Sequence, residues 1–537
     1  MNTDQSNTRT ANASAGPFPL RSLPPWPVCT AVLVVLIAVY LLTENLFILV
    51  EGRTYFVNAG FASGITASRY WLFPAGSNTR FTSMMFASLV NHTCGVSVGC
   101  TNLWEAVLVA LAFGAIAVHT FQLIGSLRLA LFTAALWALS APALSGVLWQ
   151  SIQHDKIALI LTILTLTLAV AFFSRRERPR WADAWFSVLL TGMFGVAFNA
   201  KEVAFLLPIC VCFLAIILAF RSGGSVSRNL QVAALPIIYS AWYINFYFAH
   251  LDAAWSHHIG GGSPLVDIQA LILVSLSLGN FLSLEQWGDY SREALAIAKP
   301  LYVLFVAIVA ALALYRTLKW RRPKTGFVAG ASTAILNHWR ELYLVLIMCV
   351  SLAALARTKF PSAFYMMIPF WAGSLLVILI LRFLVAGLPH SQTVFGLLLL
   401  LMAAPLLVSY STNFAPGGAV PRLLEGSRSL ERSFGTVRTL LPATQVKAVR
   451  ISVAGTPNCS WYLLTGARGE SLDTDLGPYI FDDLSVRPAM IDGNDPANLA
   501  KPPVPGEAGV RLAEDYSLES ISFDGRTLFR RADPSAK

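Results

Sequence analysis

The sequence predicts an all-α polytopic membrane protein with about eleven transmembrane helices and a small α+β domain at the C-terminal end. Of the 537 residues, 55% are hydrophobic and only 13% are charged, so the bilayer must be the solvent for most of the chain. Apolar segments of spanning length recur over 28–409. The remaining 410–537 has mixed charges, Pro and Gly punctuation and short β-like runs, as a soluble domain would.

The net charge of +10 raises the alternative of a nucleic-acid-binding protein. Residues 410–537 contain 14 Lys and Arg against 15 Asp and Glu, so the other 25 basic and 14 acidic residues lie in the membrane part. An excess of positive charge in the loops of a membrane domain is typical of loops held on the cytoplasmic side. Nucleic-acid binding is therefore disfavoured, because no basic patch is concentrated in the soluble part.

The first 27 residues are polar and then Pro-rich, which predicts a disordered cytoplasmic tail. The apolar run that begins at Val28 is too long for the apolar region of a signal peptide and lacks a small-residue cleavage site. It is predicted to be a membrane anchor, with a cleaved signal peptide as the competing interpretation.

The transmembrane domain is predicted over 28–409. A membrane-spanning helix needs about 17–25 mostly apolar residues. The segments that meet or approach this length are 28–50, 104–124, 128–148, 157–173, 184–200, 203–220, 229–249, 298–317, 341–357, 363–383 and 391–409.

Basic residues orient these segments. With the N-terminus in the cytoplasm, the densest basic clusters of the membrane part lie in loops on one side, at 175–180, at Arg221 with Arg228, and at 316–324. This asymmetry places these loops in the cytoplasm, and the Ala- and Arg-rich composition favours the inner membrane of a bacterium.

The apolar stretch 265–281 would reverse the later loops if it crossed the membrane. It is predicted instead to be a re-entrant or surface helix within a long external loop, 250–297. An odd number of spans then places 410–537 outside, in the periplasm or its equivalent. Strands of this domain are expected in AVRISVAG, SWYLLTG and SLESISF.

The first external loop is predicted to be long, 51–103, and it holds two of the seven cysteines, Cys94 and Cys100. If the loop is extracytoplasmic, these two can close a small disulfide ring. Two free thiols are an equal alternative.

Ionisable and aromatic side chains gather in the external loops, where ionisable residues at membrane ends indicate a functional site. The candidates are Glu51, Tyr55, Trp71, Arg80, His154, Asp155, Lys201, Glu202, Arg357 and Lys359. Structural explanations stay open: Glu51 as a solvated helix end, Lys201–Glu202 as a hairpin, and Asp155–Lys156 as a helix N-terminus with its compensating acid. The pair His257–His258 matches no metal motif.

Five motifs follow one another from residue 40 to 370: VEGRTYFVNAG after the first span, Trp71 with Arg80, GVLWQSIQHDKIALI, NAKEVAFLLP and ARTKFPSAFYMMIP. Together they resemble the GT-C-fold glycosyltransferases, which include protein O-mannosyltransferases and lipid A aminoarabinose transferases. The acidic pair of that family is reduced here to Glu51–Gly52. The resemblance implies a membrane enzyme that transfers a sugar from a polyprenyl-phosphate donor to an extracytoplasmic glycan, lipid or protein.

Such a reaction needs a base for the acceptor hydroxyl and cations for the lipid phosphate. Glu51 is the candidate base, and Asp155 would orient the acceptor or bind a divalent ion together with Glu51, the metal being optional. Arg80, Lys201, Arg357 and Lys359 are assigned to the phosphate. Trp71 would stack on a sugar face, with anchoring at the membrane interface as an equal alternative. Tyr55, His154 and Glu202 complete the substrate-binding set.

Other functions remain open on the sequence alone. A polysaccharide polymerase or ligase with a lipid-pyrophosphate donor would place its basic residues in a large late external loop. A transporter or flippase of lipid-linked sugars would show charges inside helices and repeated halves, and no internal repeat is found. A scaffold that displays the C-terminal domain would need no reactive cluster at all.

Overall fold

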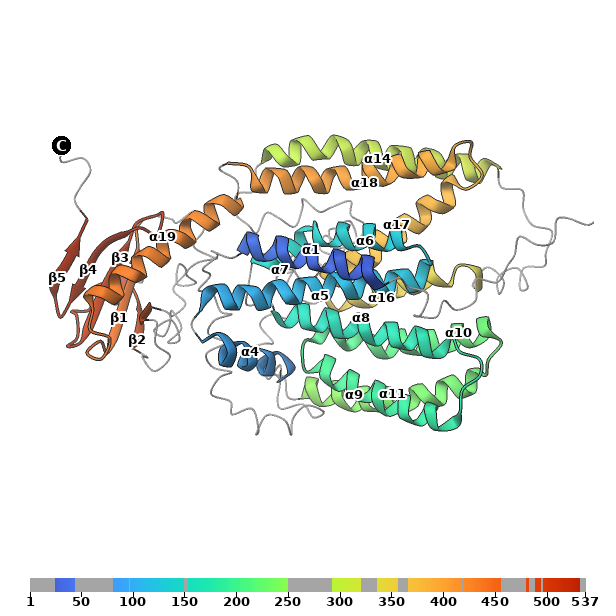
Figure 1. Ribbon diagram of the computed structural model, residues 1–537, viewed down its shortest axis with the longest axis horizontal. Helices are drawn as coiled ribbons and strands as arrows, with labels where there is room; N and C mark the ends of the chain where they lie inside the picture. Colours follow the sequence, from blue (N-terminus) through green and yellow to red (C-terminus); the bar gives the residue numbers. More distant parts are fainter. Residues whose placement is uncertain are drawn as a thin grey trace, which may run out of the picture.

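The chain forms a bundle of long apolar helices joined at one end to a small mixed sheet, as Figure 1 shows. In this computed structural model the described residues are 25–43, 81–95, 97–148, 153–249, 292–319, 336–355, 366–416, 419–454, 480–481, 488–493 and 496–531. The predicted fold class is confirmed: a helical membrane domain is followed by a C-terminal domain of one long helix and five strands.

The helices of the membrane domain follow the apolar segments of the sequence. They are α1 (Pro25–Thr43), α4 (Phe81–Cys94), α5 (Val98–Ile124), α6 (Leu127–Ala138), α7 (Ala141–Leu148), α8 (Gln153–Phe173), α9 (Arg180–Phe198), η3 (Glu202–Leu206), α10 (Leu207–Ser222), α11 (Val226–Ala249), α14 (Arg292–Lys319), α16 (Trp339–Leu355), α17 (Met367–Val385) and α18 (Ser391–Phe414). Within the described ranges, nine helical segments are long and apolar enough to cross a membrane. The chain is therefore a multi-pass membrane protein.

Two of the expected spans, 128–148 and 341–357, do not correspond to any of these nine long helices. The segment 128–148 is divided into α6 and α7, because Pro142 has no N–H to donate to Ala138. Ser140 begins the second helix, and its hydroxyl oxygen accepts a hydrogen bond from the backbone N–H of Ala143 (3.3 Å). The segment 341–357 corresponds to α16, which has 17 residues and ends at Leu355.

The predicted loop 51–103 contains helical structure in its later half. Residues 81–94 form α4, and α5 begins at Val98 rather than near residue 104. The hydroxyl of Ser97 accepts a hydrogen bond from the N–H of Cys100 (3.4 Å) and caps α5. Cys94 and Cys100 form a disulfide with their Cα atoms 5.3 Å apart, so the end of α4 is covalently tied to the first turn of α5.

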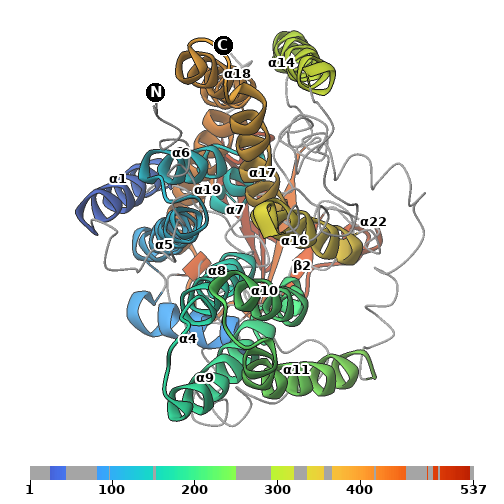
Figure 2. The same ribbon diagram turned by 90° about the vertical axis from the view of Figure 1, so that its right-hand side faces the viewer.

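Helix α5 lies at the centre of one half of the bundle and packs against α1, α6 and α8. Small residues allow the close approach: a Cβ atom at Gly114 would lie only 3.0 Å from Cγ2 of Val32 on α1. Figure 2, viewed along the helices, shows α8 and α10 between α5 and the pair α9 and α11. Helices α14 and α18 lie side by side at the edge of the bundle.

Hydrogen bonds between polar side chains in the middle of the bundle join four helices. His119 of α5 lies with Nε2 3.2 Å from the hydroxyl of Tyr343 and with Nδ1 3.1 Å from the hydroxyl of Thr167. The indole N–H of Trp371 donates to Thr120 at 3.0 Å. Because polar groups in a membrane domain need internal partners, these bonds fix the rotation of α5 relative to α8, α16 and α17.

The C-terminal domain packs α19 (Ala419–Leu440) on a sheet of order β2-β1-β3-β4-β5. The strands are β1 (Ala448–Val453), β2 (Ala489–Asp492), β3 (Glu507–Leu512), β4 (Leu518–Phe523) and β5 (Arg526–Arg530), with the short α22 (Pro496–Leu499) before β3. β1 is parallel to β2 and β3, whereas β3, β4 and β5 are antiparallel. Strands were predicted in AVRISVAG and SLESISF, and β1 and β4 confirm them; SWYLLTG lies outside the described residues.

The sheet domain is seated on the end of the helical bundle. Its buried core, which includes Phe434 of α19 and Val449 of β1, also contains Leu144 of α7. Leu42 of α1 and Val98 of α5 pack against the same core. The domain therefore covers the end of the bundle at which α1 ends and α5 begins (Figure 1).

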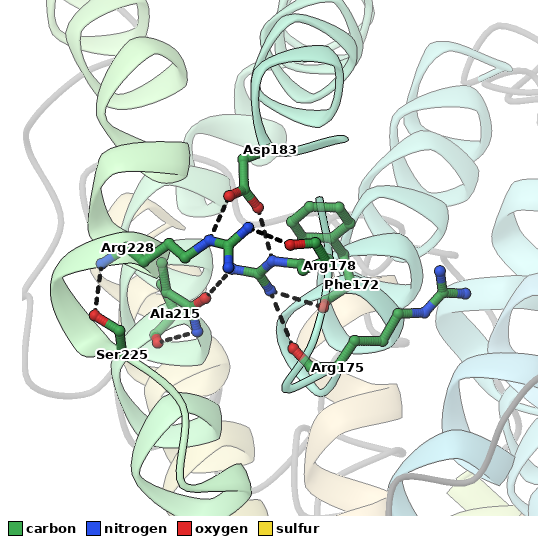
Figure 3. A network of polar contacts seen from close by, with 8 residues as sticks. Phe172, Arg175, Arg178, Asp183, Ala215, Ser225 and Arg228 are labelled. Carbon is green, nitrogen blue, oxygen red and sulfur yellow. Dashed lines mark hydrogen bonds and ion pairs between the residues drawn. The ribbon is translucent and has the colours of Figure 1, made fainter. Parts of the chain in front are cut away.

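The opposite end is held by a network of arginines around one carboxylate (Figure 3). Nε of Arg178, in the α8–α9 connection, donates to Oδ1 of Asp183 (2.7 Å), and Nε of Arg228 on α11 donates to Oδ2 (2.5 Å). Arg178 also donates to Asn229 and to the carbonyl of Phe172. Burial lowers the pKa of Arg178, and its hydrogen bond to Asp183 opposes that shift; a guanidinium nevertheless stays charged at neutral pH.

Replacing the shared carboxylate tests this network. Asp183→Ala leaves two guanidinium groups without their anionic partner, so the free energy of unfolding should fall by about 2–4 kcal/mol, somewhat less than for a fully buried pair. Unfolding in mixed micelles measures it. Glu177→Ala removes an exposed carboxylate from the same connection and should change stability by less than about 0.5 kcal/mol. Equal, small effects of both variants would contradict the role of Asp183.

Candidate functional site

Polar side chains from four parts of the chain meet at the end of the bundle that carries the sheet domain. Helices α5 and α8 begin at this end, α11 ends there, and the turn from α9 into η3 lies between them. The residues, here called the polar cluster, are Glu105, His154, Asp155, Lys156, Asn199, Lys201, Glu202, Tyr243 and Tyr247.

The deepest layer of the polar cluster is an ion pair between helices. Nζ of Lys156, in the first turn of α8, donates to Oε2 of Glu105 on α5. The two side chains are only 1% and 2% exposed. One turn nearer the end of the bundle, the amide of Asn102 donates to the carbonyl of Thr43 and ties α5 to α1. The charges of Glu105 and Lys156 can be buried here because each is paired with the other.

A second layer lies above this pair, where His154, Asp155 and Lys201 form a triangle. Nε2 of His154 is 3.0 Å from Oδ2 of Asp155 and 3.2 Å from Nζ of Lys201. Nζ of Lys201 is 3.9 Å from the same Asp155 oxygen and 3.8 Å from Oε2 of Glu202. Exposure rises from 5% for the side chain of Asp155 to 32% for that of Glu202, so Glu202 marks the accessible rim.

The position of Nε2 of His154 gives the triangle its chemical character. A protonated Nε2 donates to Asp155 but faces the ammonium of Lys201, whereas an unprotonated Nε2 accepts from Lys201 but faces a carboxylate oxygen without a hydrogen. One nitrogen cannot serve both neighbours at once. The imidazole of His154 therefore lies between a carboxylate and an ammonium, within 3.2 Å of each.

The turn that carries Lys201 is held by two neighbouring helices, α4 and α11. The backbone N–H of Thr82 and the hydroxyl of Ser83, both on α4, donate to the carbonyls of Asn199 (3.1 Å) and Ala200 (3.2 Å). Tyr243 of α11 donates to Oδ1 of Asn199 at 2.9 Å. A site held by neighbouring elements in this way needs little reorganisation when a substrate binds.

The rim is also fixed by α11. The hydroxyl of Tyr247 donates to Oε1 of Glu202 at 2.8 Å, and its ring contacts Phe205 edge-on, with centroids 5.3 Å apart. Glu202 is therefore held by a second element even though it is partly exposed.

The structure brings together four of the residues that the sequence singled out, His154, Asp155, Lys201 and Glu202, from two motifs separated along the chain. Glu51, Tyr55, Trp71, Arg80, Arg357 and Lys359 lie outside the described residues, as do His257 and His258. In the described ranges, no group of three or more His, Cys, Asp or Glu side chains is arranged to hold a metal. The divalent ion proposed with Glu51 stays a prediction.

Sequence reasoning missed Glu105 as a partner in this cluster. Lys156 was paired with its neighbour Asp155, but its ammonium contacts Glu105. The signal was present in LWEAVLVALAF, where Glu105 is the lone acid in an apolar run. A carboxylate within a transmembrane helix needs a cation or a proton. Lys156, in the first turn of α8, supplies that cation.

Comparisons with known proteins find similarity in structure but not in sequence. No family model and no curated protein sequence matches the chain. Among solved structures the chain is similar to ArnT from Cupriavidus metallidurans in the apo state, with 12% identity, a TM-score of 0.44, and coverage of 94% of this chain and 97% of that chain. The same protein bound to undecaprenyl phosphate gives 14% identity, a TM-score of 0.44, and coverage of 94% and 98%.

Proposed function

We propose that the chain is a membrane glycosyltransferase that transfers a sugar from a polyprenyl-phosphate donor to an extracytoplasmic glycan, lipid or protein. The observation that carries the proposal is the His154–Asp155–Lys201 triangle, which combines a carboxylate, an imidazole and an ammonium at one end of a membrane-spanning bundle. A donor whose lipid tail stays in the bilayer presents its sugar phosphate at that height, so reactive groups belong at the ends of the helices.

Each part of the triangle has a task in this reaction. The bond between the sugar carbon and the phosphate oxygen breaks, the acceptor hydroxyl bonds to that carbon, and its proton passes to a base. Lys201 holds the developing phosphate anion. Asp155 orients the acceptor hydroxyl and, with His154, provides a path for its proton. Glu51 remains the candidate base, and Arg80, Arg357 and Lys359 remain candidates for the phosphate.

The proposal places the polar cluster and the sheet domain outside the cytoplasmic membrane. Two observations support this orientation: the disulfide Cys94–Cys100 lies at that end of the bundle, and disulfides persist in oxidising compartments. The arginine-rich α8–α9 connection lies at the opposite end (Figure 1), as expected for a cytoplasmic loop. The sheet domain, seated beside the cluster, is then in position to contact the acceptor.

The first experiment measures the release of free polyprenyl phosphate by reconstituted protein given polyprenyl-phosphate sugars and an envelope extract as acceptor. Wild type should release it. Lys201→Met should lower kcat/KM for the donor about tenfold or more, because the developing phosphate anion loses a charge-assisted partner. Lys447→Met, on the sheet domain, is the matched control and should change nothing. If wild type releases no lipid phosphate with any donor but moves the intact donor across the vesicle membrane, the chain is a flippase.

A further inference from the structure

A basic and apolar surface at the start of α9 has no role in the proposed reaction. Arg175, Arg176 and Arg180 are exposed in and beside the α8–α9 connection. Directly after them, Trp181 and Trp185 are 68% and 69% exposed on successive turns of α9. Val188 and Leu189 continue this apolar stripe along the helix, at 56% and 51% exposure.

The neighbouring arginines are already in use. Arg178 and Arg228 share Asp183 and hold the connection in one conformation (Figure 3). Figure 3 also shows the side chain of Arg175 directed away from Asp183. Among the described residues, no ion pair and no side-chain hydrogen bond involves the guanidinium groups of Arg175, Arg176 and Arg180. Three cationic groups are thus presented outward from a fixed loop, with Glu177 as the one acid among them.

We propose that Arg175, Arg176, Arg180, Trp181 and Trp185 form a headgroup site for an anionic phospholipid of the surrounding membrane. Tryptophan is favoured at the boundary between hydrocarbon and headgroups, which places the arginines of this surface at the height of the lipid phosphates. Arginine binds a phosphate through two parallel hydrogen bonds, and basic residues beside an anionic leaflet are attracted to it.

The apolar stripe decides between a lipid and a free anion. Inorganic phosphate would contact the arginines alone and leave the two indole rings and Val188 uncovered. A phospholipid satisfies both halves of the surface, because its acyl chains cover the stripe while its phosphate meets the guanidinium groups. The site thus fits a lipid with a net negative headgroup better than a zwitterionic one.

The test uses the full chain in nanodiscs with equal amounts of phosphatidylglycerol and phosphatidylcholine, and counts the lipids retained on the protein by native mass spectrometry. Wild type should retain phosphatidylglycerol in preference. The triple variant Arg175→Gln, Arg176→Gln, Arg180→Gln should lose that preference by about a hundredfold, at roughly fivefold per arginine. The control, Arg526→Gln, Arg530→Gln, Arg531→Gln, makes the same change in charge at β5 in the sheet domain.

Two results would overturn the proposal: an unchanged preference in the first triple variant, or an equal loss in the control, which would mean that total charge alone attracts the lipid. Displacement of the lipid by millimolar inorganic phosphate would also overturn it, because the stripe would then contribute nothing. The single variant Arg176→Gln guards against misfolding of the triple one, and should lower the preference about fivefold with an unchanged unfolding midpoint.

Discussion

Asp155→Asn is expected to lower kcat for polyprenyl-phosphate release by about 10² or more, with a smaller change in the donor KM. The carboxylate oxygen lies 3.0 Å from Nε2 of His154 and 3.9 Å from Nζ of Lys201. An uncharged amide cannot stabilise a proton on the imidazole, so the step in which the acceptor hydroxyl loses its proton is slowed. A loss confined to kcat is the sign of an interaction made in the transition state.

Glu202→Gln is the matched control for Asp155→Asn. It makes the same carboxylate-to-amide change in the same cluster, at a position where the side chain is 32% exposed and the amide oxygen can still accept from Tyr247. A fall of less than about tenfold is expected, because the charge it removes lies at the partly exposed rim of the cluster, where solvent screens it more than it screens Asp155. If Glu202→Gln costs as much as Asp155→Asn, the charge of the whole cluster matters and the triangle has no special role.

Glu51→Gln in the same assay separates the two carboxylates proposed for catalysis. If Glu51 is the base, kcat of this variant also falls by about 10². The loss of kcat in the double variant Glu51→Gln, Asp155→Asn should then be far smaller than the product of the two single losses, because both residues serve one proton transfer. If Glu51→Gln keeps full activity while Asp155→Asn does not, Asp155 is the base and Glu51 is a helix end.

The positions of the membrane helices were predictable because the bilayer imposes one simple requirement, an apolar segment of sufficient length. The ends of the helices were less predictable. Helix α5 begins at Val98, six residues before the predicted start, because Thr101 and Asn102 are polar yet buried against neighbouring elements. Hydropathy treats such residues as loop, although the helix continues through them. The break before α7 depends on Ser140 and Pro142, a local signal that the apolar run around it concealed.

The candidate site was predictable where topology alone decided it. Once the spans were counted, QHDK and NAKE had to lie at the same end of the bundle, and the contact of Asp155 with Lys201 follows from that. The pairing of Lys156 with Glu105 depends on how α5 and α8 are rotated about their axes, over 51 positions of sequence. Tyr247 was equally hard to find, because an aromatic residue near a helix end is also typical of the membrane interface.

The largest effect on stability is expected from breaking the buried pair of Glu105 and Lys156. Lys156→Met leaves a carboxylate in a nearly water-free site between α5 and α8, and the free energy of unfolding should fall by about 3–5 kcal/mol. Glu105→Leu should cost a similar amount, because it leaves the ammonium unpaired. Unfolding by SDS titration in mixed micelles, with the midpoint and slope recorded for each variant, measures both.

The double variant Glu105→Leu, Lys156→Met shows whether this pair serves structure or chemistry. Two apolar side chains of similar volume remove both charges, so stability should return to within about 1 kcal/mol of wild type or exceed it. If the pair is only a link between α5 and α8, the double variant also regains catalytic activity, because Asp155 and Lys201 keep their positions. Recovered stability without recovered activity would place the charges of Glu105 and Lys156 in the reaction itself. Single variants that each cost less than about 1 kcal/mol would contradict the burial of an obligatory pair.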